Sequence, residues 1–217
     1  MPSPRLVVFD WDGTLMDSER QIVHCMQAAA ADLDLVVPMY CEVRSIIGLG
    51  LPEAIQVLFP GHEAGLRERV RQCYAGHFIA GAGGRSELFP GAPELLDRLR
   101  ANGQLMAVAT GKSRAGLDRV LCDSGLSGYF HITRCADETA SKPDPLMLHE
   151  ILGALSVSAD EAVMIGDTTF DLEMAARAGM RSIGVGHGAH DVEVLERHSP
   201  MAIVPDLKAL LPYLASL

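Results

Sequence analysis

Short apolar runs alternate with longer amphipathic stretches over most of this chain. The short runs are rich in valine, isoleucine, leucine and alanine, as buried strands are. They predict strands over residues 6–9, 105–109, 129–135, 162–165, 181–185 and 202–204. The stretches that follow carry apolar side chains at helical spacing. They predict helices over residues 93–100, 113–124, 144–154, 170–178 and 207–214. This alternation indicates an α/β fold with a parallel sheet covered by helices on both faces.

The region after the first strand has a different pattern, with helical periodicity and no strand. Its four predicted helices cover residues 17–35, 39–47, 52–59 and 62–80, and the glycine-rich residues 81–84 follow them. The first strand nevertheless belongs with the later α/β part. The chain is therefore predicted to consist of a core (residues 1–15 and 86–217) and an inserted α-helical domain (residues 16–85).

Composition narrows the classes of protein that fit. The 217 residues include 48% apolar residues, and the net charge of −10 argues against a nucleic-acid partner. No apolar run reaches membrane-spanning length, and Asp10 interrupts the first one, so neither a membrane segment nor a signal peptide is expected. Five widely spaced cysteines form no C-x-x-C pair. They predict reduced, mostly buried thiols and a cytoplasmic location.

Two carboxylates close the first predicted strand. Asp10 and Asp12 are two residues apart, so both side chains can face one site at the carboxyl edge of the sheet. Two anions at that distance repel each other unless a cation or a shared proton holds them. Gly13 then permits a sharp turn. Taken alone, the motif is equally compatible with a strand that ends in an Asp-Gly turn.

Two further stretches carry groups that bind anions. Thr110 and Gly111 follow a predicted strand and precede a helix, where a hydroxyl and free backbone N–H groups form an anion site. Alone, this turn is better explained by Ser113 as a helix cap. Lys142, beside Pro143, is placed to neutralise a phosphate or the Asp10 and Asp12 pair. Alone, it is better explained as a solvated loop lysine.

A second pair of carboxylates follows the strand predicted over residues 162–165. Asp167 would lie at the strand end and Asp171 in the first turn of the next helix. Asp171 alone would be explained by the helix dipole. Two strands that both end in acid pairs, with the Thr-Gly and Lys-Pro stretches between them, are a strong combined signal of one site.

Together these stretches resemble the haloacid dehalogenase superfamily. The motifs are Asp10-x-Asp12-Gly13-Thr14, Thr110-Gly111, Lys142-Pro143 and Gly166-Asp167-x-x-x-Asp171. The helical insertion resembles the C1 cap of that superfamily, and the whole chain is similar to its phosphoglycolate phosphatase-like members. The resemblance implies a Rossmann-like core and a Mg²⁺-dependent phosphatase. Its substrate would be a small phosphorylated metabolite, phosphoglycolate-like or a sugar phosphate, and the protein a monomer or weak dimer.

The resemblance also assigns roles to the motif residues. Asp10 would attack phosphorus and form an aspartyl-phosphate, and Asp12 would act as general acid and then as general base. Thr110, Gly111 and Lys142 would hold the phosphate oxygens.

The same resemblance assigns a magnesium site. The Mg²⁺ ligands would be Asp10, the backbone carbonyl of Asp12, and Asp167. Asp171 would bind the ion directly, through water, or as a supporting group.

The residues exclude some other functions within this superfamily and leave others open. Asp12 argues for a leaving group that needs a proton, unlike a halide. Residues 16–85 contain no lysine, which argues against phosphonoacetaldehyde hydrolase chemistry. A β-phosphoglucomutase-like enzyme stays open. A non-catalytic phosphate-binding regulator is disfavoured, since the carboxylates would then be costly without a use.

The choice of substrate is expected to depend on the cap. Residues 44–50 resemble the substrate-specificity loop of the family, and Arg44 would meet a carboxylate or a second phosphate of the substrate. A solvated arginine on a cap helix is an equally good interpretation of Arg44.

Overall fold

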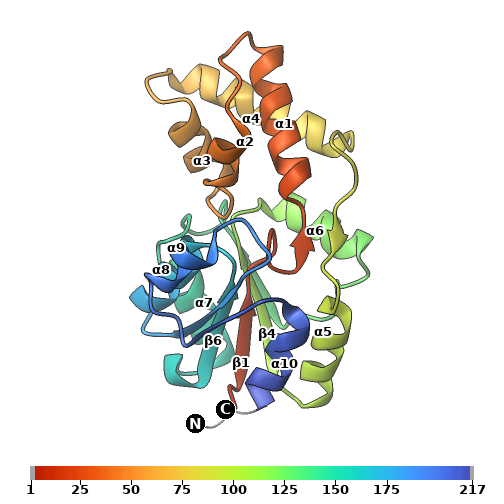
Figure 1. The fold of residues 1–217 in the computed structure, drawn as a ribbon, viewed down its shortest axis with the longest axis vertical. Helices are drawn as coiled ribbons and strands as arrows, with labels where there is room; N and C mark the ends of the chain where they lie inside the picture. Colours follow the sequence, from red (N-terminus) through yellow and green to blue (C-terminus); the bar gives the residue numbers. More distant parts are fainter. Residues whose placement is uncertain (1–2, 216–217) are drawn as a thin grey trace.

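A six-stranded parallel sheet forms the centre of the computed structural model, which describes residues 3–215 (Figure 1). Every neighbouring pair of strands in this sheet is parallel. In spatial order the strands are β5 (Ile132–Cys135), β4 (Leu105–Thr110), β1 (Leu6–Phe9), β6 (Ala162–Gly166), β7 (Arg181–Val185) and β8 (Ala202–Val204). The predicted α/β fold with a Rossmann-like parallel sheet is confirmed.

Alternate residues of β1 pack against helices on opposite faces of the sheet. Val7 and Phe9 belong to one buried cluster with apolar side chains of α5, α6 and α10. Leu6 and Val8 belong to a second cluster, with side chains of α7 and α8. All four side chains are fully buried, which explains the unbroken apolar run of this strand. The core helices are α5 (Ala92–Ala101), α6 (Arg114–Asp123), α7 (Leu146–Leu155), α8 (Thr169–Arg177), α9 (Val192–Glu196) and α10 (Leu207–Ala215), with the 3₁₀ helix η1 (Ala159–Glu161).

Four further helices lie over the carboxyl ends of the strands and form the part called the cap below (Figure 1). They bury an apolar cluster of their own. A short antiparallel ribbon of β2 and β3 carries the chain into and out of the cap. The ribbon adjoins residues 16 and 85, the predicted domain boundaries, although the division into two domains stays a prediction. These elements are α1 (Glu19–Asp32), α2 (Tyr40–Arg44), α3 (Leu51–Leu58), α4 (Ala64–Ile79), β2 (Met16–Asp17) and β3 (Glu87–Leu88).

The structure differs from the sequence expectation in its shortest elements. The cap helix predicted over residues 39–47 ends at Arg44 and continues as turns, because Ile46 and Ile47 are buried and Gly48 has a φ of 104°. The ribbon, η1 and α9 were not predicted. Segments of two to five residues are too short for a hydrophobic period to identify them.

The structure bears on two expectations from composition, the burial of the cysteines and the lack of a membrane-spanning segment. The expectation of mostly buried thiols is wrong, since Cys25 and Cys135 are buried whereas Cys41 and Cys122 are exposed and Cys73 is intermediate. All five are free. None of the helices within residues 3–215 combines the length and the apolar composition that crossing a bilayer requires.

Candidate active site

A cavity of about 400 Å³ lies between the cap and the carboxyl ends of β1 and β4. Its floor includes Asp10, Asp12, Thr110, Gly111 and Lys112. Parallel register brings the first two stretches together, because Phe9 of β1 pairs with Val108 of β4. Open α/β sheets bind ligands at this edge, where loops leave the strands. The cavity is therefore the candidate active site.

Asp10 occupies the position directly after β1. Its backbone N–H donates to the carbonyl of Ile165 (2.9 Å), which fixes the residue beside the end of β6. The side chain is 1% exposed. Oδ1 lies 2.7 Å from Nζ of Lys142, but neither carboxylate oxygen accepts a hydrogen bond of normal geometry from the described residues. Burial raises the pKa of Asp10 well above its ordinary value, against the pull of Lys142, and nearby Asp171 and Asp167 raise it further.

Lys142 is fully buried between two carboxylates. Its Nζ lies 2.7 Å from Oδ1 of Asp10 and donates to Oδ1 of Asp171 (2.6 Å). Burial alone would lower the pKa of Lys142, yet Asp10 and Asp171 together raise it above its ordinary value. The interpretation of a solvated loop lysine is therefore wrong. Of the predicted Asp10 and Asp12 pair, Lys142 contacts Asp10, while Asp12 has other partners. The alternative prediction, that Lys142 neutralises a phosphate, stays a prediction.

Asp171 holds Lys142 from the start of α8. Its second oxygen, Oδ2, accepts hydrogen bonds from the backbone N–H (3.1 Å) and the hydroxyl (2.7 Å) of Thr168. These bonds cap the helix, as helix-dipole reasoning expects. Both oxygens of Asp171 are thus already engaged. A Cβ on Gly166 would overlap this carboxylate, so glycine is required at the end of β6.

Asp167 follows β6 and is completely buried. Its Oδ1 accepts from the hydroxyl of Thr14 and its Oδ2 from the backbone N–H of Ala189, both at 2.7 Å. Burial and Asp171 raise the pKa of Asp167 to about 7. A Cβ on either Gly13 or Gly188 would overlap the carboxylate, so the surrounding backbone approaches Asp167 as closely as only glycine permits.

The carboxylates of Asp10, Asp167 and Asp171 form one acidic cluster. One oxygen from each lies within 4.8 Å of the others. Three buried carboxylates with one lysine leave excess negative charge, which favours a bound cation or protons. Hard oxygen donors suit Mg²⁺. Among the described residues no group forms a hydrogen bond to Oδ2 of Asp10, so this oxygen is available as a metal ligand.

Asp12 lies outside this cluster and is engaged differently. Its Oδ1 accepts from the hydroxyl of Ser18 (2.5 Å) and lies 2.9 Å from Nζ of Lys112. Lys112 also lies over the ring of Phe78 from the cap, 4.7 Å from its centroid. Sequence reasoning gave Lys112 no role, although its place directly after Thr110 and Gly111, in a chain with three lysines, was a usable signal.

Thr110 and Gly111 lie where they were predicted, at the end of β4. Thr110 is buried, and its hydroxyl accepts from the backbone N–H of Lys112 (3.1 Å). A Cβ on Gly111 would approach the carbonyl oxygen of Gly48 to 2.7 Å and overlap that of Leu49. The cap loop therefore packs on this glycine, and the two predicted phosphate-binding residues lie directly under it.

Arg44 is not among the side chains that line the cavity. Its guanidinium donates to Glu19 in the cap (3.4 Å) and to Asp191 in the core (3.0 Å). A third bond goes to the carbonyl of Gly188 (3.3 Å). The Arg44 side chain is 31% exposed, so it is in part solvated, as the alternative interpretation expects, and it is also ion-paired. Substrate binding by Arg44 stays a prediction.

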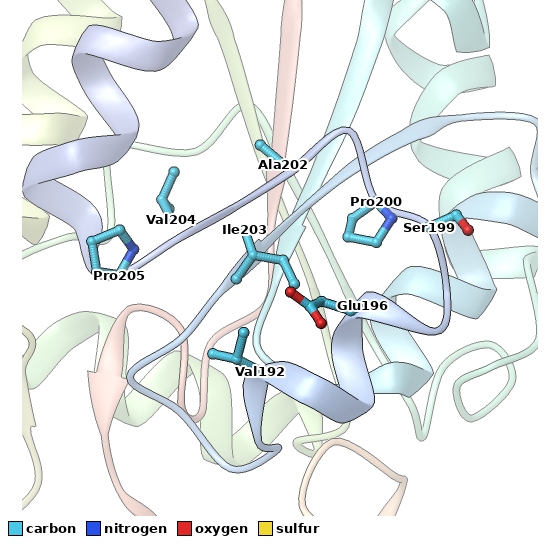
Figure 2. Close-up of a pocket in the computed structure, with 8 residues that line it drawn as sticks. All are labelled: Val192, Glu196, Ser199, Pro200, Ala202, Ile203, Val204 and Pro205. Carbon is cyan, nitrogen blue, oxygen red and sulfur yellow. The ribbon is translucent and has the colours of Figure 1, made fainter.

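A second cavity, of about 450 Å³, lies between α9 and the edge strand β8 (Figure 2). Apolar and proline side chains form most of it. Glu196 is its one charged lining residue. It contains no residue of the motifs, so the candidate chemistry lies at the cavity under the cap.

Comparison with known proteins identifies the family. The family model for haloacid dehalogenase-like hydrolases matches residues 7–185. The chain is 38% identical over 205 residues to the probable phosphatase IndB of Dickeya dadantii, covering 92% of this chain and 88% of the relative. It is 31% identical over 221 residues to phosphoglycolate phosphatase of Agrobacterium fabrum, with 98% and 93% covered. The structure superposes on a haloacid dehalogenase-like hydrolase of Bacteroides fragilis with a TM-score of 0.88 at 27% identity, covering 95% and 99% of the two chains.

The protein belongs to the haloacid dehalogenase-like hydrolase family. Within it, the chain falls among the phosphoglycolate phosphatase-like members, as its motifs predicted.

Proposed function

We propose that this enzyme is a Mg²⁺-dependent phosphatase that hydrolyses the phosphate monoester of a small metabolite through an aspartyl-phosphate on Asp10. The observation that carries the proposal is the free Oδ2 of Asp10. Asp10 lines the cavity under the cap, and its carboxylate belongs to a cluster with Asp167 and Asp171, which are buried beside it. The family membership and the two phosphatase relatives support the same reaction class.

Asp10 and Asp12 would divide the reaction into two displacements. An oxygen of Asp10 forms a bond to phosphorus while the bond from phosphorus to the ester oxygen breaks, and Asp12 gives that oxygen a proton. In the second step Asp12 takes a proton from water, whose oxygen attacks phosphorus and releases Asp10 and inorganic phosphate. Ser18 and Lys112 hold the carboxylate of Asp12 in place, which supports its role in proton transfer.

Residues of three stretches would hold the metal. Asp10, Asp167 and the backbone carbonyl of Asp12 would bind Mg²⁺, which when present reduces the repulsion between an anionic nucleophile and an anionic phosphate. Asp167 is oriented for this by Thr14 and by the backbone of residue 189. Asp171 would act as a supporting group, because both its oxygens already bind Lys142 and Thr168.

The remaining predicted residues would bind the phosphoryl oxygens. The hydroxyl of Thr110, the N–H of Gly111 and the ammonium of Lys142 would stabilise charge on the equatorial oxygens in the transition state. Thr110 and Gly111 line the cavity beside Asp10. Lys142, in contact with Asp10, would also favour the ionised form of that carboxylate, against the effect of burial.

The test is inorganic phosphate release by the purified protein, with Mg²⁺ and with a chelator. The panel contains an aryl phosphate, phosphoglycolate, sugar phosphates, pyrophosphate and nucleotides. Mg²⁺-dependent release that disappears in Asp10→Asn is expected. Release that persists at the same rate in the chelator or in the variant would contradict the mechanism. Isomerisation of a sugar phosphate without release would instead identify a phosphomutase, which uses the same core residues.

A further inference from the structure

We infer that the group released from phosphate is an uncharged alcohol bearing an aromatic or similarly flat apolar ring, and not a small carboxylate such as glycolate. This inference rests on the proposed phosphatase function and specifies its substrate class. It comes from the side of the cavity that faces the phosphate site, where the cap supplies almost only apolar side chains.

The cap wall consists of side chains from three segments. Helix α1, the loop after α2 and helix α4 each turn apolar groups toward the cavity. They are Ile22, Met26, Ile46, Ile47, Leu49, Tyr74 and Phe78. Several of these also belong to the buried cluster of the cap. The wall is therefore a fixed part of the cap core and not a set of mobile surface residues.

The cations that line the cavity are mostly occupied by other groups. Lys112 lies 2.9 Å from Asp12 and over the ring of Phe78. Arg71, the one arginine of the cap wall, donates to both carboxylate oxygens of Glu68 (2.7 and 2.6 Å) on the surface of α4. Arg119 of α6 is exposed.

Besides Asp10 and Asp12, two further acidic residues line the cavity and oppose a second negative charge on the substrate. Glu53 of α3 and Asp137 after β5 are both exposed lining residues. A carboxylate on the leaving group would thus lose its hydration among the apolar side chains of the cap wall, whose arginine, Arg71, is paired with Glu68. Arg119, the remaining lining cation, belongs to α6 of the core and is exposed to solvent. Burial of an unpaired carboxylate is strongly unfavourable. An uncharged apolar group gains free energy in the same place, because it removes apolar surface from water.

Two aromatic side chains favour a ring in particular. Tyr74 and Phe78 lie one helical turn apart on α4, with ring centroids 5.9 Å apart and planes tilted by 34°. Aromatic groups pack on each other in offset or edge arrangements. The hydroxyl of Tyr74 has no hydrogen-bond partner among the described residues, so it can bind one polar substituent of that ring. The volume of about 400 Å³ also exceeds what a phosphoryl group with a two-carbon acid needs.

The kinetic test compares alkyl phosphates that differ in the group beyond the ester carbon. Wild-type kcat/KM is measured with Mg²⁺ for benzyl phosphate, 2-hydroxyethyl phosphate and phosphoglycolate. All three release an alcohol bonded through a CH₂ group, which avoids the activated leaving group of an aryl phosphate. Benzyl phosphate is expected to be preferred over each of the others by at least about 10-fold. A higher kcat/KM for phosphoglycolate than for benzyl phosphate would overturn the inference.

A pair of variants tests the role of the cap wall. Phe78→Leu removes the ring but keeps an apolar side chain, and it should reduce the preference for benzyl over 2-hydroxyethyl phosphate by about 5-fold or more. Phe59→Leu is the matched control, because Phe59 is buried in the cap but does not line the cavity. It should leave the ratio unchanged. An unchanged ratio in Phe78→Leu would contradict a ring site at this wall.

A binding measurement separates this inference from the proposed reaction. The phosphonates 2-phenylethylphosphonate and 3-phosphonopropionate correspond to benzyl phosphate and phosphoglycolate but cannot be hydrolysed at the bridging position. Calorimetry in Mg²⁺ should show at least about 10-fold tighter binding of the phenyl compound. Tighter binding without any phosphate release would support the inference about the cavity and reject the phosphatase proposal. Tighter binding of 3-phosphonopropionate than of the phenyl compound would reject the inference, whether or not the protein releases phosphate.

Discussion

The floor and the cap wall of one cavity are built on opposite physical principles. On the floor, Asp10 lines the cavity, and Lys142, Asp167 and Asp171 are buried around and behind it. These charged groups are at most 1% exposed, and they are held by ion pairs, hydrogen bonds and closely approaching glycine backbone. On the wall, most contacts are apolar and are made to other cap side chains, with the contact of Phe78 to Lys112 as an exception. Directional bonds fix a few atoms to a fraction of an ångström, whereas apolar packing selects by size and shape.

This difference separates the reaction from the choice of substrate. In the proposed mechanism the floor would perform the same displacement on any phosphate monoester that reaches it, because its groups would contact only the phosphoryl oxygens and the metal. The wall decides which leaving group fits under the cap. Changes on the floor should therefore affect every substrate alike, while changes on the wall should alter ratios between substrates.

The largest effect is expected from Asp10→Asn, which tests most directly whether the floor acts on all substrates alike. Loss of the nucleophile should lower kcat by about four orders of magnitude or more for every substrate. The fold should survive, since the amide has the shape of the carboxylate and removes a charge that burial disfavours. Circular dichroism and phosphate release check both points, with Asp123→Asn on the exposed end of α6 as control. If Asp10→Asn lost activity toward one substrate only, the floor would not serve all substrates in the same way.

The next effect concerns Lys142, which neutralises two of the three clustered carboxylates. Lys142→Met should lower kcat about 10²–10³-fold by removing a donor to the transition state. It should also lower the free energy of unfolding of the metal-free protein by about 3 kcal/mol, because buried anions lose their partner. Urea denaturation measures this loss, and exposed Lys208→Met is the control. Equal stability of the two variants would show that Lys142 is not the counter-ion of the cluster.

A smaller effect should appear in the pH dependence of metal binding. In the metal-free protein, the pKa of Asp167 is about 7, above its ordinary value of 3.8, so the stability from this group is complete below pH 4 and is lost as pH rises through 7. In the proposed site Mg²⁺ would replace the proton on Asp167, and the stabilisation by Mg²⁺ should therefore grow over the same pH range. Scanning calorimetry should show a rise in Tm of about 5 °C at pH 8 in saturating Mg²⁺, and little change at pH 5.5. Asp167→Asn should show no Mg²⁺ effect at either pH.

The floor could be predicted from the sequence to a large extent because it is encoded locally. Asp10 and Asp167 directly follow apolar strands, and parallel pairing of those strands brings their ends together. The burial of Lys142 could not be deduced from its own stretch. Its partner Asp171 is 29 residues away in the sequence. Judged only from its neighbours, a lysine beside a proline is expected in a solvated loop.

The wall was much less predictable, because apolar helix positions look the same whether they face a cavity or a core. The link from Asp12 through Lys112 to Phe78 joins three distant stretches, and no local pattern indicates it. The end of α2 at Arg44 depends on the turn that brings residues 46–49 over the core. Tertiary contacts determined these features, so only the structure could provide them.

The smallest effect is expected from Arg44, which lies where the cap contacts the core. Its guanidinium joins Glu19 of the cap to Asp191 and Gly188 of the core, and it does not line the cavity. If it only holds the cap closed, Arg44→Gln and Asp191→Asn should raise KM by the same modest factor, less than about 5-fold, for every substrate, as for a half-exposed ion pair.

Direct binding of a charged substrate by Arg44 would give a different result. Arg44→Gln would then raise KM far more than Asp191→Asn, and only for substrates with a second anionic group. Steady-state kinetics of both variants and the double variant, with benzyl phosphate and phosphoglycolate, distinguish the two cases. Non-additive effects in the double variant would assign Arg44 to the cap–core contact, because two residues that act through one ion pair lose it only once.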